Sequence, residues 1–128
     1  MNRIVLDASA ILAVINAEPG AEKLTPDLLA GAVGSTVNLA EVQTKLVSRG
    51  WSSDEAWEDA TSPVREILSF NEEHARLAGD LLTHTRHLGL SLGDRACLAL
   101  GMALKAPVYT AEKAWKKLKV GVRVHVIR

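Results

Sequence analysis

The amino-acid sequence predicts a single α/β domain, an α/β/α sandwich whose central, mainly parallel sheet has about five short strands. Two observations lead to this fold class. Short segments rich in Val and Ile alternate along the chain with segments of helical periodicity, which is the pattern of repeated β–α units. The 128 residues also suffice for one domain, and no linker, repeat or low-complexity segment divides them. We therefore expect one domain over residues 1–128.

The N-terminal part of the chain predicts two strands and two helices. Ile4–Leu6 is a short apolar run and therefore a strand candidate. Residues 8–16 are predicted as a short helix, which the following Pro-Gly pair closes. A second helix is expected over residues 21–31, and a short strand is expected over residues 33–36.

The middle of the chain continues this alternation. Apolar residues recur at helical spacing over residues 38–49, and a glycine follows them, which predicts a helix that ends there. The acidic residues 53–60 predict a further helix with a solvated face. Residues 66–70 are a strand candidate, and residues 72–87 have the pattern of one amphipathic helix.

The C-terminal part predicts the remaining elements. Residues 92–105 are apolar nearly all round, so we expect a buried helix. A strand over residues 107–109 and a short helix over residues 112–117 follow. Valines at every second position from Val122 to Val126 predict a final edge strand.

The composition excludes several classes of protein. Cys97 is the only cysteine, so the chain has no disulfide framework, CxxC redox pair or cysteine-based zinc site. The N-terminal apolar segment contains Asp7 and lacks the uncharged core of a signal peptide. The longest apolar stretch, residues 97–104, is far shorter than the roughly 18 residues of a membrane span. We therefore expect a cytoplasmic protein with no membrane partner.

The formal net charge is zero, but the charges are unevenly distributed. Residues 105–128 contain seven Lys or Arg and one Glu, a net charge of +6. Residues 1–104 contain eight Lys or Arg and fourteen acidic residues, a net charge of −6. A basic segment on an acidic body favours an anionic partner such as nucleic acid. A basic surface that only improves solubility is an equally good interpretation.

Four carboxylates stand at comparable positions of the predicted β–α units. Asp7 directly follows the first strand, and Glu41 lies near the start of the helix after the second strand. Asp94 lies at the start of the buried helix, and Glu112 follows the strand at residues 107–109. Because ligand sites of parallel sheets lie at the carboxyl ends of the strands, we expect all four side chains at one edge of the sheet.

Each carboxylate also has a purely structural interpretation. Asp7 is suited to cap a helix. Asn38 with Glu41, and likewise Ser91 with Asp94, have the spacing of a capping box. For any one of these residues, capping is the simpler interpretation. Four acidic caps at one edge of a sheet are harder to explain in this way.

Carboxylates gathered within a few ångströms repel one another and raise one another's pKa, so such a cluster is typically kept charged by a bound cation. A set of oxygen ligands suits Mg²⁺ or Mn²⁺ rather than zinc or copper. Such an ion polarises a phosphoryl oxygen and activates water. The residues therefore predict metal-assisted hydrolysis of phosphodiester bonds, with the basic C-terminal segment holding the nucleic-acid backbone.

Four short motifs carry a family resemblance: IVLDASA at residues 4–10, LAEV at 39–42, LGDR at 92–95 and YTAEKAW at 109–115. In order and spacing they resemble the motifs of PIN-domain ribonucleases, and the chain is similar to the VapC toxins of toxin–antitoxin pairs. The resemblance implies an α/β/α fold and endonucleolytic cleavage of RNA that depends on Mg²⁺, for which Mn²⁺ can substitute. It also implies a homodimer and a cognate, VapB-like antitoxin that blocks the site.

By matching position, the resemblance assigns Asp7, Glu41 and Asp94 as metal ligands and Glu112 as the fourth acidic residue of the catalytic site. The family usually carries Asp at the fourth position. The extra methylene of Glu112 moves its carboxylate about 1.5 Å further from the backbone. This departure supports an alternative function, a PIN-like module of weak or no activity that binds a partner protein or RNA.

The same motifs contain four further candidate site residues. Ser9 and Thr110 match hydroxyl positions that line the site in the family. Arg95 and Lys113 directly follow Asp94 and Glu112, so we expect both cations to lie near the site and contact phosphate.

Overall fold

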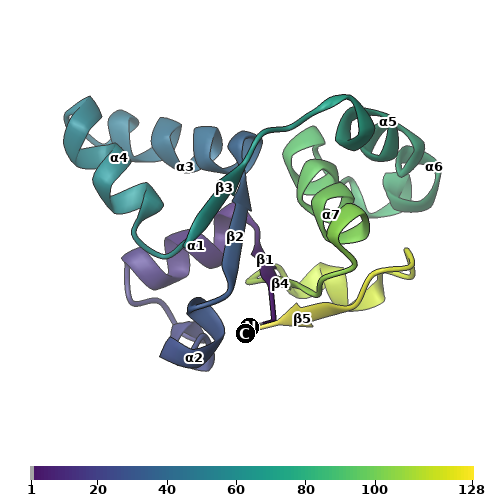
Figure 1. The fold of residues 1–128 in the computed structure, drawn as a ribbon, viewed down its shortest axis with the longest axis horizontal. Coiled ribbons are helices and arrows are strands. Elements are labelled where there is room, and N and C mark those ends of the chain that lie inside the picture. The colour runs from purple at the N-terminus through teal and green to yellow at the C-terminus, as the bar shows by residue number, and fades with distance from the viewer. Residues whose placement is uncertain (1) are drawn as a thin grey trace.

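A computed structural model describes residues 2–128 of the protein, and a five-stranded sheet forms the centre of its fold (Figure 1). The strands are β1 (Ile4–Leu6), β2 (Ala32–Ser35), β3 (Glu66–Leu68), β4 (Val108–Thr110) and β5 (Val124–Val126). They lie in the order β3-β2-β1-β4-β5, and each strand pairs with its neighbours in parallel. The first strand of the chain therefore occupies the middle of the sheet.

Helices cover both faces of this sheet (Figure 1). One face carries α1 (Ala8–Ile15), α2 (Pro26–Leu29), α3 (Thr36–Ser48) and α4 (Ser53–Thr61). The other face carries α5 (Glu72–Asp80), α6 (Leu82–Thr85) and α7 (Leu92–Leu104). Short 3-10 helices form parts of the connections: η1 (Ala21–Lys23), η2 (Arg86–Leu88) and η3 (Lys113–Lys117). The predicted α/β/α sandwich is confirmed.

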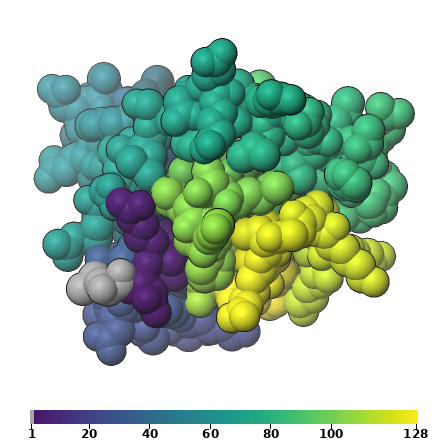
Figure 2. Space-filling view, turned by 45° about the vertical axis from the view of Figure 1, so that its right-hand side comes forward, coloured from purple at the N-terminus to yellow at the C-terminus, as the bar shows by residue number. Residues whose placement is uncertain are grey.

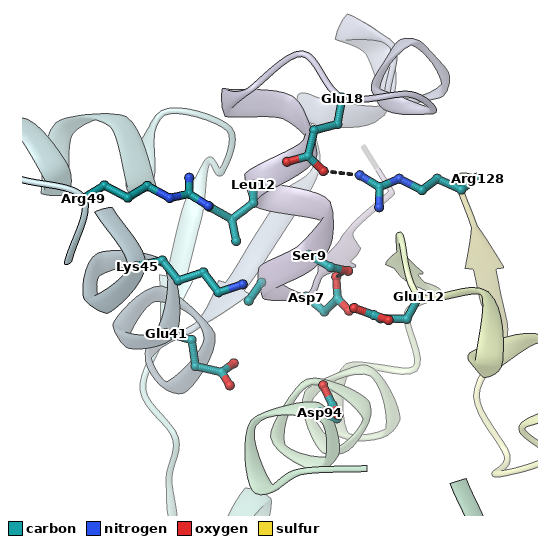
Figure 3. A pocket seen from close by; sticks show the side chains of 11 residues that line it. Asp7, Ser9, Leu12, Glu18, Glu41, Lys45, Arg49, Asp94, Glu112 and Arg128 are labelled. Carbon is teal, nitrogen blue, oxygen red and sulfur yellow. Dashed lines mark hydrogen bonds and ion pairs between the residues drawn. The ribbon is translucent and has the colours of Figure 1, made fainter. Parts of the chain in front are cut away.

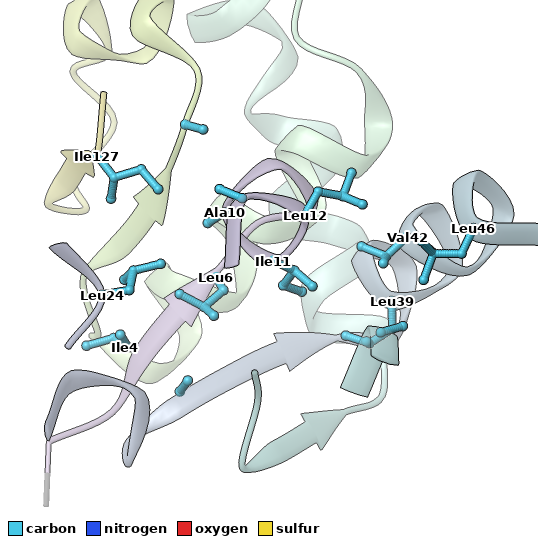
Figure 4. Packing of buried hydrophobic residues seen from close by; sticks show 14 of the residues in the cluster. Ile4, Leu6, Ala10, Ile11, Leu12, Leu24, Leu39, Val42, Leu46 and Ile127 are labelled. Atoms are coloured by element: carbon cyan, nitrogen blue, oxygen red, sulfur yellow. The ribbon is translucent and has the colours of Figure 1, made fainter. Parts of the chain in front are cut away.

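Alternate residues of β1 enter different hydrophobic cores, because successive side chains of a strand point to opposite faces. Ile4 and Leu6 pack with residues of α1, α3 and α4 (Figure 4). Val5 packs with residues of α7 on the other face. Burial on both faces explains why β1 is an uninterrupted apolar run. It also places Asp7, the next residue, at the middle of the sheet's carboxyl edge.

The helix predicted over residues 21–31 is wrong, because η1 and α2 replace it. Pro26 disfavours a helical conformation for the residue before it, and Thr25 has extended backbone with φ −68° and ψ 160°. Thr25 instead caps α2, since its Oγ1 accepts a hydrogen bond from the Leu28 amide at 3.3 Å. A single proline therefore divides this segment.

The helix predicted over residues 72–87 is also interrupted, since α5, α6 and η2 follow one another there. The hydroxyl of Thr85 donates to the carbonyl oxygen of Leu81 at 2.9 Å, at the junction of α5 and α6. Threonine side chains compete in this way with helical backbone bonds, and their branched Cβ lowers helix propensity. The amphipathic pattern was right about burial only in part, because Ala78 and Leu81 are buried whereas Ala75 and Leu82 are exposed. It did not show the breaks.

The C-terminal elements agree more closely with the predictions. The buried helix is confirmed as α7, and the final edge strand is confirmed as β5. The segment expected as a short helix at residues 112–117 is the 3-10 helix η3. Figure 2 shows the C-terminal segment (yellow) beside the end of α7 (green), where both line one cavity. Among residues 2–128, no helix combines the length and apolar character needed to cross a bilayer.

Candidate active site

The four predicted carboxylates line a single pocket at the carboxyl edge of the sheet (Figure 3). Asp7 follows β1, and Glu112 follows the neighbouring strand β4. Glu41 comes from α3, which follows β2, and Asp94 comes from the first turn of α7. The cavity has a volume of about 280 Å³. The sequence-based prediction that these side chains share one edge of the sheet is therefore confirmed.

Asp7 is the most constrained of the four carboxylates and is only 2% exposed. Its Oδ1 accepts hydrogen bonds from the Ala10 amide and the Ser9 hydroxyl, both at 2.8 Å. Its Oδ2 accepts a hydrogen bond from the Thr110 hydroxyl at 2.6 Å. Burial raises the pKa of Asp7 to about 7 although these hydrogen bonds lower it, and the negative charge of Asp94 adds to the rise. Asp7 therefore caps α1 and lines the pocket at the same time.

Ser9 and Thr110 connect the ends of β1 and β4 behind this carboxylate. The Ser9 Oγ accepts a hydrogen bond from the Ala111 amide at 2.9 Å, and the Thr110 Oγ1 accepts one from the Glu112 amide at 3.0 Å. Ser9 lines the pocket, whereas Thr110 is fully buried and contacts Asp7 rather than the cavity. Both hydroxyls therefore hold Asp7 in place.

Glu41 is held over the start of α7. The Asn38 Nδ2 donates to Glu41 Oε1 and to the carbonyl oxygen of Gly93, each at 3.0 Å. A Cβ at Gly93 would overlap the Glu41 carboxylate, so a glycine is required for this close approach. Burial raises the pKa of Glu41, and the negative charge of Asp94 raises it further, whereas Asn38 and Lys45 lower it. Asn38 thus links Glu41 to the helix that carries Asp94.

The capping-box interpretation is wrong for one pair and confirmed for the other. The N-cap of α3 is Ser35, so Asn38 lies inside the helix and bonds to Glu41 through its side chain. Ser91 and Asp94 do form a capping box, in which the Ser91 amide donates to Asp94 Oδ2 at 2.9 Å. Asp94 nevertheless lines the pocket, so a cap and a site residue are compatible.

Glu112 has a different environment from the other three carboxylates. It is exposed, and its side chain makes no hydrogen bond or ion pair with residues 2–128. Figure 3 shows its carboxylate beside Asp7. It precedes η3 but does not cap that helix through its side chain. Its longer side chain therefore reaches the pocket without being fixed there.

Two predicted phosphate contacts do not lie at the pocket. The Arg95 guanidinium donates from Nη1 to the Ala78 carbonyl oxygen at 2.9 Å, so the side chain turns toward α5. Lys113 lines a neighbouring cavity together with residues of the segment after α1. Both predictions relied on adjacency in sequence, and consecutive residues of a helix point in different directions. The pocket contains other cations instead, namely Lys45, Arg49 and Arg128.

Sequence reasoning missed Lys45 and Arg49, although a signal was present. They follow Glu41 by four and eight residues, and this spacing places all three on one face of a helix. Arg128 has no comparable signal, because its position depends on β5 packing beside β4. Its guanidinium pairs with Glu18 and donates from Nε to the Pro19 carbonyl oxygen at 3.1 Å.

The carboxylates are close enough to affect one another's pKa, but they do not converge on one position where a metal ion could lie. Burial raises the pKa of the Cys97 thiol, and the negative charges of Asp7, Asp94 and Glu41 all raise it further, so all three carboxylates lie near this buried group. Within residues 2–128, no three acidic, His or Cys side chains lie close enough to surround one metal ion in this conformation. The donor set is nevertheless entirely oxygen, which suits Mg²⁺ or Mn²⁺.

The chain belongs to the PIN domain family, because the family model described as "PIN domain" matches residues 4–121. A search of curated proteins with the sequence found no match.

Solved structures of similar fold come from toxin–antitoxin systems. A chain of VapBC2 from Rickettsia felis, crystallised on a promoter DNA fragment, has 22% identity and a TM-score of 0.73, with 95% of this chain and 96% of that chain covered. A chain of DNA-bound VapBC from Salmonella typhimurium has 14% identity and a TM-score of 0.77, with both chains covered fully. VapC20 of Mycobacterium tuberculosis, described as a toxin that cleaves the sarcin–ricin loop, has 20% identity and a TM-score of 0.70, with 94% and 98% covered. At these identities, the likeness shows a shared fold.

Proposed function

We propose that the protein is a metal-dependent endoribonuclease that acts as the toxin of a toxin–antitoxin pair. One observation carries this proposal: in a PIN domain, four carboxylates from separate β–α units line one pocket at the carboxyl edge of a parallel sheet. The similarity in fold to VapC20, a toxin that cleaves the sarcin–ricin loop, supports RNA as the substrate.

We propose Mg²⁺ as the metal, with Mn²⁺ able to substitute. Asp7, Glu41 and Asp94 would hold the ion, and Glu112 would complete the acidic set. Raised pKa values of Asp7 and Glu41 support this assignment, because a cation offsets the cost of keeping buried carboxylates charged. Such an ion supplies a polarised phosphoryl oxygen and an activated water molecule.

The chain's own residues orient this chemistry. Ser9, Thr110 and the Ala10 amide fix both oxygens of Asp7, which keeps its carboxylate in one orientation. Asn38 holds Glu41 over the start of α7. Glu112 is exposed and unbonded within the described chain, so it is free to orient the attacking water.

A VapB-like antitoxin and a second copy of the chain are the proposed protein partners. Structures of VapBC complexes with a similar fold support the antitoxin. Trp51 and Trp57 of the protein are 39% and 44% exposed, and large apolar side chains of this kind are suited to a protein contact. The proposal places the protein in the cytoplasm, where its RNA substrate lies.

Cleavage of RNA by the purified, partner-free chain tests the proposal. Structured and single-stranded RNA would be incubated with the protein in Mn²⁺, in Mg²⁺ and in EDTA, and Asp94→Asn would be assayed in parallel. We expect cleavage that requires the metal and is lost in Asp94→Asn, while thermal unfolding shows that the variant remains folded. Absence of both cleavage and Mn²⁺ binding would contradict the proposal and favour an inactive module that binds a partner.

A further inference from the structure

We propose that Lys45 of α3 and Arg49, the C-cap residue of that helix, bind phosphates of the RNA strand next to the cleaved bond, so that the strand runs along α3. This inference rests on the proposed function and adds to it the residues that position the substrate. It differs from the sequence-based expectation, in which the basic segment at residues 105–128 holds the RNA backbone.

The first argument is the geometry of α3. Glu41 and Lys45 lie one turn apart on the same face of α3, and Arg49, the C-cap residue, follows four positions further on. All three line the pocket. Figure 3 shows the Lys45 and Arg49 side chains extending from the α3 segment toward the cavity. A strand whose phosphate lies at Glu41 and Asp94 would therefore meet two cations in succession along α3.

The second argument is that these cations are free. Neither Lys45 nor Arg49 makes an ion pair or a side-chain hydrogen bond with residues 2–128. Arg128, the third cation of the pocket, pairs with Glu18 and donates to the Pro19 carbonyl oxygen. Arg128 thus links the residues after β5 to the segment after α1, whereas the donors of Lys45 and Arg49 remain available for a ligand.

The third argument is that cations are distributed unevenly between the α7 side and the α3 side of the carboxylate pocket. On the α7 side, Arg95 turns away to the Ala78 carbonyl oxygen, and the residues exposed at the helix start are Ser91 and Leu92. The cationic side chains of the pocket that are unpaired within the described chain, Lys45 and Arg49, therefore lie on the α3 side, whereas Arg128 is paired with Glu18. Since five carboxylates line the pocket, a polyanion is repelled unless cations neutralise its phosphates. The α3 side is the direction in which an RNA strand meets the least repulsion.

The basic C-terminal segment is a poorer RNA track because much of it lies elsewhere. Lys105 and Arg123 precede β4 and β5, so they lie at the amino edge of the sheet, opposite the pocket. Together they line a cavity with Pro107. Lys119 lines a further cavity between α5 and α7. Among the cations of this segment, Arg128 lines the carboxylate pocket, and it is already paired with Glu18.

Binding of RNA by two charge-matched double variants tests the inference. Lys45→Ala/Arg49→Ala removes one Lys and one Arg from the pocket, and Lys119→Ala/Arg123→Ala removes one of each from exposed positions elsewhere. Both would be made in the Asp94→Asn background, which prevents cleavage. Fluorescence anisotropy would measure binding of a labelled single-stranded RNA oligonucleotide of mixed sequence, in Mn²⁺, over a range of salt concentrations.

We expect the α3 variant to bind about tenfold more weakly at low salt and to lose about 1.4 from the slope of log affinity against log salt, about 0.7 for each phosphate contact. The control should keep the slope of its parent. Calorimetry in the wild-type background, where Asp94 is intact, should show that Lys45→Ala/Arg49→Ala binds Mn²⁺ no more weakly than the wild type does. In the cleavage-competent background, KM should rise while kcat changes little.

The outcomes separate this inference from the proposed function. If the wild type cleaves RNA and the α3 variant keeps the affinity and salt slope of its parent, the inference is wrong and the function stands. If the control loses as much as the α3 variant, the contact is diffuse and the inference is wrong. If the wild type neither cleaves RNA nor binds Mn²⁺ but the α3 variant alone loses RNA binding, the phosphate contacts of Lys45 and Arg49 stand and the ribonuclease proposal fails.

Discussion

Asp7 and Glu112 end neighbouring strands of the sheet and line the same pocket, yet their surroundings are opposite. Asp7 is buried, and three donors fix its two oxygens. Glu112 is exposed, and no other residue of the described chain holds its carboxylate. The comparison teaches that a motif specifies where a carboxylate stands, whereas its neighbours determine how much it is constrained and what its charge costs.

Loss of the Asp7 charge should have the largest effect on activity. Asp7→Asn keeps an N-cap residue for α1 but removes a proposed metal ligand, the carboxylate that its neighbours hold most tightly. We expect cleavage to fall by about a hundredfold or more and Mn²⁺ affinity to fall with it. RNA cleavage and calorimetry measure the two effects. Full activity of this variant would show that the fixed carboxylate is only a cap.

The same residue should make the metal-free protein less stable as the pH rises. Burial raises the pKa of Asp7 from 3.8 to about 7, so the folded state holds a proton that the unfolded state has released. The free energy of unfolding should therefore fall as the pH rises from the lower of these pKa values to the higher, by up to about 4 kcal/mol. Urea unfolding in EDTA at pH 5 and pH 8 measures the larger part of this change, up to about 3 kcal/mol.

Two comparisons check this assignment. Asp7→Asn should remove most of the fall in stability, because an amide does not titrate. Mn²⁺ should restore the stability of the wild type at pH 8, since a ligand that binds the folded state stabilises it. An identical pH dependence in the wild type and in Asp7→Asn would contradict the assignment.

Glu41 is held less tightly than Asp7 but more tightly than Glu112. Gly93→Ala tests how much the position of the Glu41 carboxylate matters for activity. The added Cβ would overlap the Glu41 carboxylate, which must then move away from α7. We expect cleavage and Mn²⁺ affinity to fall about tenfold, a loss similar to that of other residues that orient metal ligands. The matched control is Gly79→Ala in α5, where a Cβ has open space. This control should keep full activity and gain about 0.5–1 kcal/mol of stability.

The smallest effect is expected at Glu112, whose carboxylate no other residue of the described chain holds. Glu112→Gln should reduce cleavage by only about threefold to tenfold and leave stability within about 0.5 kcal/mol, because no folded-state contact of the side chain is lost. Kinetic assays and thermal unfolding measure these values. Glu112→Asp restores the residue usual in the family and should retain activity. A loss at Glu112 as large as that at Asp7 would remove the distinction between the two carboxylates.

Local patterns were sufficient to predict the fold class but not the interruptions. The apolar run of β1 and the periodic segments of α3 and α7 are strong signals because burial dictates their composition. The breaks at Thr25 and near Leu81 depend on single residues that compete with helical bonding. Such local competition is hard to weigh against the periodicity of a longer segment.

The site divides in a similar way. Asp7, Glu41, Asp94 and Glu112 could be predicted because strand ends of a parallel sheet meet at one edge. The direction of Arg95 could not, since it depends on how α7 packs against α5. Arg128 could not be placed because its position follows from the pairing of β5 with β4. Residues set by topology were therefore predictable, and those set by tertiary packing were not.

The hydrogen bond between Asp7 and Thr110 joins residues 103 positions apart. β1 lies in the middle of the sheet, but its neighbour β4 follows it by about a hundred residues and is therefore synthesised much later. A growing chain on the ribosome, whose N-terminal part emerges first, therefore lacks one side of β1 and the hydroxyl that holds Asp7. The Asp7 side of the pocket can therefore form only after residue 110 has left the ribosome, about a hundred residues after Asp7 itself.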